Sequence, residues 1–116
     1  MADLLVDTDV FVDHLRGARL LQPGRDRLSY STITRAELFA GAGGEEQTVG
    51  RLLAPFQELP VDRAIAEAAG RIRRTTGIRL PDALIAATAL GHGRALLSRN
   101  RRDFERVPKL RLHVPR

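Results

Sequence analysis

The chain has 116 residues, of which 43% are hydrophobic and 28% are charged, a composition typical of one globular domain with its own core. It contains no cysteine, which excludes disulfides, thiolate metal sites and a cysteine nucleophile. Any bound metal should therefore be a hard cation held by oxygen ligands. The formal net charge is +5, and 18 of the 19 basic residues are arginine. This charge is typical either of a polyanion-binding protein or of a solvated arginine-rich surface.

No apolar run approaches the ~18 residues that a membrane span requires. The chain also does not open with a basic segment followed by a signal-like apolar stretch. The expected location is therefore the cytoplasm.

The first half of the chain alternates short apolar segments with helical ones. Residues 2–6, which contain the apolar run at 4–6, predict a short buried strand, and residues 9–15 carry apolar positions that fit a helix. A polar loop containing Pro23 and Gly24 is expected over residues 18–27. The next expected elements are a strand at 28–31, a helix at 34–40, an amphipathic helix at 48–56 and a strand at 58–60.

The second half continues the same alternation. Its clearest amphipathic helix spans residues 62–76, with apolar residues on one face and arginines largely on the other. Pro81 fits the first turn of the following helix, which should end at Gly91 or Gly93. The last expected elements are a strand at 95–98, a helical turn at 103–106 and a strand at 110–114. Such an order predicts a mostly parallel sheet covered on both faces by helices.

Acidic residues stand at the edges of these apolar segments. They are Asp7, Glu37, Asp82, and Asp103 with Asn100 beside it. In a parallel α/β sheet such junctions gather at the carboxyl edge of the strands, where sites form. Grouped carboxylates repel one another unless a cation neutralises them, so the pattern predicts a site for Mg²⁺ or Mn²⁺. A metal held in this way can activate water for attack on a phosphoryl group without a serine or histidine nucleophile.

Each of these acids also has a simpler interpretation as part of a helix start. Thr34 and Glu37 have the spacing of a capping box, in which Glu37 would bond back to the backbone N–H of Thr34. Asp82 would favour the helix dipole in the first turn after a proline. Asn100 and Asp103 have the spacing of an N-cap and the third helical residue.

Asp9 has two interpretations as well. It lies two residues from Asp7, so in an extended segment both carboxylates would share a face and a metal. If the helix starts at Asp9, its side chain caps that helix, and this is the interpretation we favour.

Four segments, in order, make the chain resemble the PIN-domain ribonucleases, and among them the VapC-type toxins of bacterial type II toxin–antitoxin pairs. The segments are LVDTDV at 5–10, STITRAEL at 31–38, PDALIAATA at 81–89 and LSRNRRDF at 97–104. The resemblance covers nearly the whole chain. It implies one PIN-like domain over residues 1–116, folded as a three-layer α/β/α sandwich with a mostly parallel central sheet. It also implies an endoribonuclease that uses Mg²⁺ or Mn²⁺ to cleave structured or single-stranded RNA of the transfer or ribosomal class. A homodimer and a VapB-type antitoxin that occludes the active site are implied too.

The resemblance also assigns roles to individual residues. The catalytic and metal-binding residues would be Asp7, Glu37, Asp82 and Asp103. Asn100 stands where many relatives carry aspartate, which leaves open whether Asn100 or Asp103 faces the metal and whether one or two ions bind. Thr8, Ser98 and Asn100 would orient a carboxylate or a metal-bound water. The arginines near the site in sequence, which are candidates for RNA contact, are Arg16, Arg35, Arg79, Arg99, Arg101 and Arg102.

Two other functions fit part of the pattern. Asp7 and Asp9 match the Asp-x-Asp start of haloacid-dehalogenase-like phosphatases, but that class also needs a downstream lysine and an acidic pair. Lys109 is the only lysine, and no Asp-Asp pair exists. A non-catalytic PIN-like RNA-binding module is the other alternative, although carboxylates at an RNA surface weaken binding unless a cation compensates them. The apolar face of residues 48–56 is a candidate contact for a dimer.

Overall fold

The computed structural model describes residues 2–42 and 44–115. Five parallel strands form one sheet in the order β3-β2-β1-β4-β5. The strands are β1 (Asp3–Val6), β2 (Arg27–Ser31), β3 (Gln57–Leu59), β4 (Ala95–Leu97) and β5 (Leu112–His113). The helices are α1 (Thr8–Leu15), α2 (Thr32–Glu37), the irregular turn η1 (Leu38–Ala42), α3 (Glu46–Leu53), α4 (Arg63–Thr76), α5 (Leu80–Gly91) and α6 (Arg101–Phe104). None of the described helices has the length and apolar character needed to cross a membrane.

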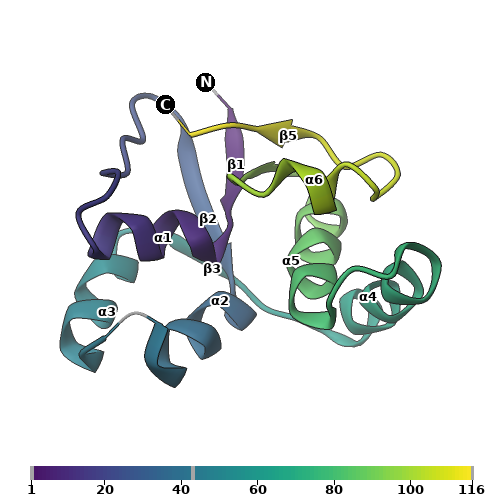
Figure 1. Ribbon diagram of the computed structural model, residues 1–116, viewed down its shortest axis with the longest axis horizontal. Coiled ribbons are helices and arrows are strands. Elements are labelled where there is room, and N and C mark those ends of the chain that lie inside the picture. The colour runs from purple at the N-terminus through teal and green to yellow at the C-terminus, as the bar shows by residue number, and fades with distance from the viewer. Residues whose placement is uncertain (1, 43, 116) are drawn as a thin grey trace.

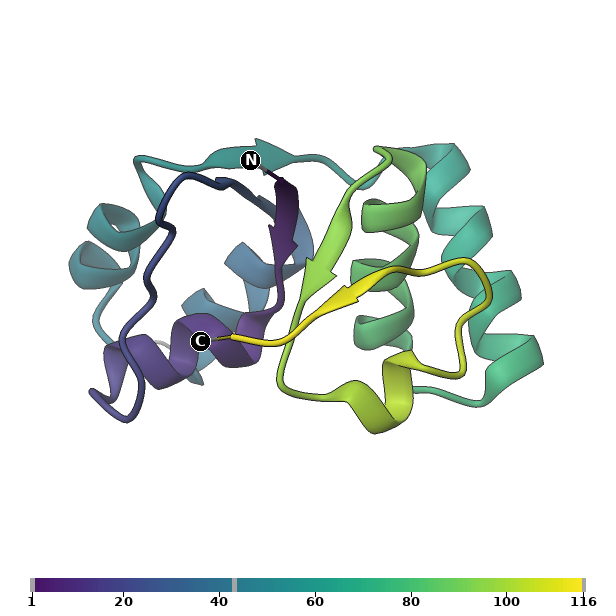
Figure 2. The same ribbon diagram turned by 90° about the horizontal axis from the view of Figure 1, so that it is seen from above.

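Helices cover both faces of the sheet (Figure 2), which confirms the predicted three-layer α/β/α sandwich. The alternation of side chains along a strand divides the core into two clusters. Leu4 and Val6 of β1 point into the cluster that includes α1, η1 and α3. Leu5 points into the other cluster, which includes α4 and α5. Because β1 is packed on both faces, its residues 4–6 are continuously apolar rather than alternating.

Strand β1 lies at the centre of the sheet, and its carboxyl end is level with that of β4. Val6 pairs with Leu97 in register, and the next backbone N–H, that of Asp7, donates to the carbonyl of Leu97 at 2.9 Å. Figure 1 shows α1 leaving the end of β1 and α2 leaving the end of β2. The residues that follow these strands are therefore held at one edge of the sheet.

Helices α4 and α5 pack against each other and fix the position of Asp82. The side chain of Asp62 caps α4 by accepting from the N–H of Ile65 at 2.9 Å, and Gly77 ends it in the left-handed region at a φ of 77°. Pro81 lies in the first turn of α5, as predicted. The hydroxyl groups of Thr88 in α5 and Ser31 are hydrogen-bonded at 3.0 Å, which ties α5 to the start of α2.

The helix predicted at 34–40 begins two residues earlier, and its predicted capping box is wrong. Ser31 is the N-cap of α2, because its hydroxyl accepts from the N–H of Ile33 at 3.3 Å. Thr34 therefore lies inside the first turn, and its side chain is free to bond elsewhere. Regular helix stops at Glu37, and the following turn kinks at Gly41, whose φ is 120°.

Two of the apolar side chains in residues 48–56, the segment expected to contact a second copy, are not available for such a contact. Val49 and Leu53 of α3 are fully buried in the core, and Leu52 and Phe56 pack against it. Packing within the chain therefore explains Val49 and Leu53, and the dimer contact through the partly exposed Leu52 and Phe56 stays a prediction.

Candidate active site

Asp7 is the most enclosed acid at the carboxyl edge of the sheet. It is 3% exposed and stands at the N-cap position of α1, but its carboxylate makes no capping hydrogen bond. Instead, its Oδ2 accepts from the hydroxyl of Ser98 at 2.8 Å. Ser98 Oγ in turn accepts from the backbone N–H of Asn100 at 2.9 Å. The residues after β4 therefore orient the acid after β1, as expected for Ser98.

The pKa of Asp7 is raised from its ordinary value of 3.8 to about 7, and burial is the largest cause. The negative charges of Asp9 and Asp82 also contribute to this rise, whereas the hydrogen bond from Ser98 opposes it. A carboxyl group in this environment is ionised at neutral pH only at a cost, which a nearby cation would remove.

Asp82 interacts electrostatically with the other acids at this edge of the sheet. Its side chain is 13% exposed in the first turn of α5, with Oδ2 at 3.8 Å from Nε of Arg79. Burial raises the pKa of Asp82, the charge of Arg79 lowers it, and the charges of three neighbouring acids raise it. These neighbours are Glu37, Asp9 and Asp103. The four predicted acids and Asp9 therefore form one interacting group, called the acidic cluster below.

Glu37 is positioned by two threonine hydroxyls. Thr8 Oγ1 donates to Glu37 Oε1 at 2.8 Å and lies 2.9 Å from Thr34 Oγ1. Because Thr8 has one hydroxyl hydrogen and gives it to the carboxylate, Thr34 must be the donor to Thr8. Thr34 is fully buried and was predicted only as a helix cap. The sequence signal for this supporting role is the spacing alone, since Thr34 precedes Glu37 by three residues and so lies on the same side of α2.

The cap interpretation holds for Asn100 and Asp103. Asn100 is the N-cap of α6, and its Oδ1 accepts from the N–H of Asp103 at 3.4 Å. Its Nδ2 also donates to Asp103 Oδ2 at 3.1 Å. Asn100 therefore fixes the carboxylate of Asp103, which still acts electrostatically on Asp82.

The prediction that Asp9 caps the first helix is wrong. Helix α1 begins one residue earlier, at Thr8, so Asp9 lies in its first turn. Its side chain is exposed and acts on both Asp7 and Asp82, which places it at the rim of the acidic cluster.

A PIN domain is matched over residues 4–110 of the chain. The chain belongs to the PIN-domain family. Its relatives include two proteins of Mycobacterium tuberculosis. Ribonuclease VapC10 is 44% identical over 98 residues, covering 74% of each protein, and Ribonuclease VapC19 is 36% identical over 122 residues, covering 91% of this chain and 95% of the relative. Among PIN domains, the chain is therefore of the VapC type.

Solved structures confirm the PIN fold. A chain in the toxin–antitoxin complex from Klebsiella pneumoniae is 30% identical, with a TM-score of 0.72 over 92% of this chain and 94% of that one. A chain in the structure of VapBC2 from Rickettsia felis, bound to a DNA fragment from its promoter, has a TM-score of 0.82 at 17% identity. It covers 98% of this chain and 99% of its own.

The arginines around the acidic cluster of this PIN domain divide into two groups. Arg35 is engaged by Glu58 and the hydroxyl of Tyr30, and Arg99 Nε lies 2.6 Å from Asp13 Oδ2. The other candidates for RNA contact are exposed: Arg16, Arg79, Arg101 and Arg102. Of these, Arg101 forms an ion pair with Glu105 one helical turn away, with Nε of Arg101 at 3.2 Å from Oε1 of Glu105.

The acidic cluster offers the oxygen ligands that a hard cation needs, but its side chains are not yet arranged to coordinate one. In residues 2–42 and 44–115, no three acidic or histidine side chains already stand close enough together to coordinate an ion. The donors are all oxygens, however, and the most buried of them, Asp7, is surrounded by like charge. This combination fits Mg²⁺ or Mn²⁺, whose ligands are carboxylates and water.

Proposed function

We propose that this PIN domain is the toxin of a toxin–antitoxin pair and that it cleaves RNA with a bound divalent cation, Mg²⁺ or Mn²⁺. The observation that carries the proposal is the buried carboxyl of Asp7, whose pKa is raised to about 7 beside other acids. Burial and the neighbouring negative charges disfavour the ionised carboxylate of Asp7, and a bound cation would offset both effects. The names of the Mycobacterium tuberculosis relatives, both ribonucleases, support RNA as the substrate.

Asp7, Glu37, Asp82 and Asp103 would hold the cation. When bound, it supplies positive charge for a phosphoryl oxygen and lowers the pKa of a coordinated water. The chain itself orients the ligands: Ser98 fixes Asp7, Thr8 fixes Glu37 and Asn100 fixes Asp103. Such supporting hydrogen bonds set the direction of each carboxylate before RNA arrives.

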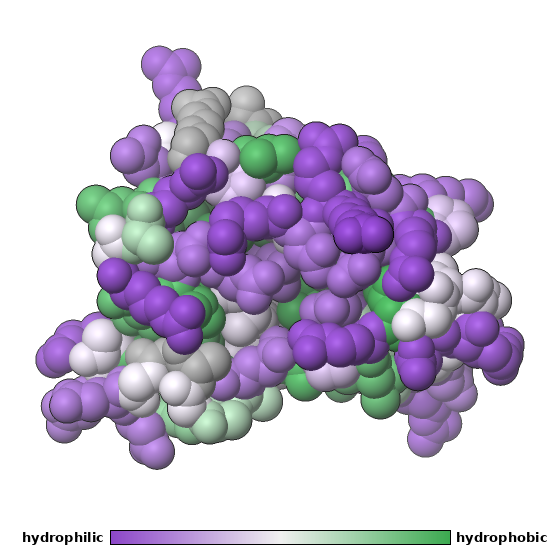
Figure 3. Space-filling model, viewed as in Figure 1, coloured by the Kyte–Doolittle hydropathy of each residue, from purple (hydrophilic) through white to green (hydrophobic). Residues whose placement is uncertain are grey.

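RNA would be held by its phosphates. Arg79 is 80% exposed and begins the segment that leads into Asp82, so a phosphate at the acidic cluster is within its reach. The exposed residues Arg16, Arg101 and Arg102 would extend this contact. Figure 3 shows hydrophilic side chains over much of one broad face, with hydrophobic side chains in separate areas. Phosphate contacts give affinity without sequence choice, so substrates of the transfer or ribosomal RNA class are proposed from the family resemblance alone.

A VapB-type antitoxin and a second copy of the chain are the proposed partners. The similar chains from Rickettsia felis and Klebsiella pneumoniae belong to toxin–antitoxin assemblies. An antitoxin that covers the acidic cluster would block both the cation and the RNA.

Cation dependence is tested with purified protein and a mixture of structured RNAs. Cleavage should occur with Mg²⁺ or Mn²⁺, stop when EDTA removes the cation, and return when Mg²⁺ is added in excess. Binding without cleavage, unchanged by EDTA, would instead favour the non-catalytic RNA-binding module. A phosphorylated Asp7 trapped during turnover would favour the phosphatase alternative.

The hydroxyl of Thr34 should matter although it lies behind Glu37. The Thr34→Val variant keeps the shape of the side chain but removes the donor to Thr8, so Thr8 and Glu37 lose their fixed orientation. We expect the turnover number to fall about tenfold with little change in KM, as for other residues that support metal ligands. Thr34→Ser keeps the donor and should stay close to wild type. Equal rates for the valine and wild-type proteins in single-turnover cleavage would contradict this role.

A further inference from the structure

An ion pair between Asp13 and Arg99 joins helix α1 to the segment after β4. Nε of Arg99 lies 2.6 Å from Oδ2 of Asp13. The side chain of Asp13 is only 14% exposed, whereas that of Arg99 is 46% exposed. The pair is therefore partly withdrawn from solvent, where an unmatched charge is costly and the pairing is less screened than on an open surface.

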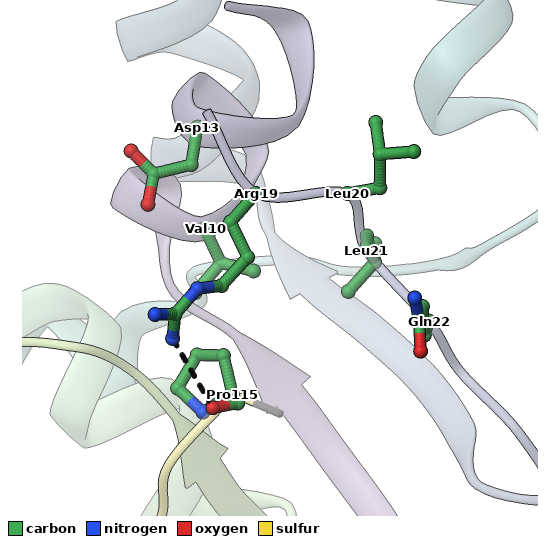
Figure 4. Close-up of a pocket in the computed structure, with 7 residues that line it drawn as sticks. All are labelled: Val10, Asp13, Arg19, Leu20, Leu21, Gln22 and Pro115. Carbon is green, nitrogen blue, oxygen red and sulfur yellow. Dashed lines mark hydrogen bonds between the residues drawn. The ribbon is translucent and has the colours of Figure 1, made fainter. Parts of the chain in front are cut away.

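A second arginine near Asp13, Arg19, is engaged by another residue, so Arg99 is the ion-pair partner of Asp13. Figure 4 shows Arg19 extending to Pro115, and it donates to the carbonyl oxygen of that residue at 3.3 Å. The carboxylate of Asp13 points away from Leu20 and Leu21 in the same view. The backbone carbonyl of Asp13 accepts from the N–H of Ala18 at 3.0 Å, so the end of α1 is also fixed. Asp13 thus offers Arg99 a rigid anchor.

Arg99 lies between the two residues that orient the carboxylates. Ser98, before it, donates to Asp7 at 2.8 Å, and Asn100, after it, donates to Asp103 at 3.1 Å. The backbone N–H of Asn100 also closes onto Ser98 Oγ at 2.9 Å. Any movement of the backbone at Arg99 would move both of these donors together.

We propose that Asp13 and Arg99 are a positioning pair, which anchors the segment 98–100 to α1 and so keeps Ser98 on Asp7. Arg99 is then not an RNA contact, although its sequence neighbours suggest that role. The inference rests on the proposed function only for its effect on cleavage. The anchoring itself is a property of the chain without RNA or cation.

The first test measures anchoring directly, by amide hydrogen exchange of the cation-free protein with NMR detection. Asp13→Asn and Arg99→Gln should each speed exchange at Asn100 on the order of tenfold, because its N–H bond depends on the position of Ser98. The double variant should exchange no faster than either single variant, since both remove one interaction. Arg27→Gln, which removes an ion pair with Asp3 at the first residues of β1 and β2, is the matched control and should leave Asn100 unchanged.

The second test separates anchoring from RNA contact. Both single variants should lower the turnover number by a similar factor, roughly tenfold, with KM near the wild-type value. The slope of the logarithm of RNA affinity against the logarithm of salt concentration should be unchanged in Arg99→Gln. Loss of a phosphate contact would instead lower the magnitude of this slope by about one. Arg102→Gln is the comparison variant, an exposed arginine that should lower the slope.

Three results would overturn the proposal: unchanged exchange at Asn100 in either single variant, additive effects in the double variant, or a lower salt slope in Arg99→Gln. The exchange results hold whether or not the protein cleaves RNA. A protein that shows the expected exchange but no cleavage would therefore contradict the proposed function and leave the anchoring intact.

Discussion

The Asp7→Asn variant should be more stable than the wild-type protein at pH 8 when no cation is bound. Asparagine can still accept from Ser98, but it carries no charge in the buried position next to Asp9 and Asp82. In the wild-type protein the pKa of Asp7 is raised from 3.8 to about 7, so the folded state binds this proton more tightly than the unfolded state does. The free energy of unfolding of the wild-type protein therefore falls by up to roughly 4 kcal/mol as the pH rises from about 4 to about 7. Above pH 7 this contribution no longer changes.

Urea or thermal unfolding in EDTA at several pH values measures this effect. The variant and the wild-type protein should differ little near pH 4, and the advantage of the variant should be complete near pH 8. Added Mg²⁺ should narrow the difference, because a cation that binds only the folded wild-type protein stabilises it. Glu105→Gln, at an exposed acid of α6, serves as the control and should show no such pH dependence. A variant that is less stable than the wild-type protein at pH 8 in EDTA would show that Asp7 is not under electrostatic strain.

The Asp82→Ala variant should lose RNA cleavage while keeping its fold. Asp82 interacts with Glu37, Asp9 and Asp103, so its removal takes away a cation ligand at the centre of the acidic cluster. We expect cleavage to fall by more than about 100-fold, the upper end for residues that only support metal ligands. The cost to the fold should be small, because burial and the neighbouring acids already disfavour the charged form of Asp82 and Pro81 still starts α5.

Glu46→Ala is the matched control for Asp82→Ala. Glu46 is also an acid in the first turn of a helix, α3, but it is exposed and lies outside the acidic cluster. Cleavage rates and Mn²⁺ affinity by titration calorimetry should drop in the Asp82 variant and remain unchanged in the control. Equal activity in both variants would mean that Asp82 does not hold the cation.

The sequence alone was sufficient to predict the parallel sheet and that Asp7, Glu37, Asp82 and Asp103 lie at one of its edges, but not that Asp9 joins them. Continuous apolar runs such as residues 4–6 predict buried parallel strands, and acids placed just after them meet at one edge because parallel strands share a direction. The proline at the start of α5 and the glycine at the end of α4 likewise mark helix ends that depend only on local backbone geometry.

The partners of individual side chains could not be predicted in this way. Thr34 has the spacing of a capping residue, but its hydroxyl bonds to Thr8 because Ser31 already caps α2. Arg99 follows the site in sequence, but a carboxylate from α1 holds it. Both outcomes depend on contacts between segments far apart along the chain, which no local pattern encodes.

The central claim, that this PIN domain cuts RNA at the acidic cluster, is tested most directly by mapping RNA 5′ ends in bacterial cells after induction of the protein. The wild-type chain should produce new ends at a small set of positions and arrest growth, and Asp82→Ala at the same protein level should produce neither. Identical new ends with both proteins, or none with the wild-type protein, would contradict the account.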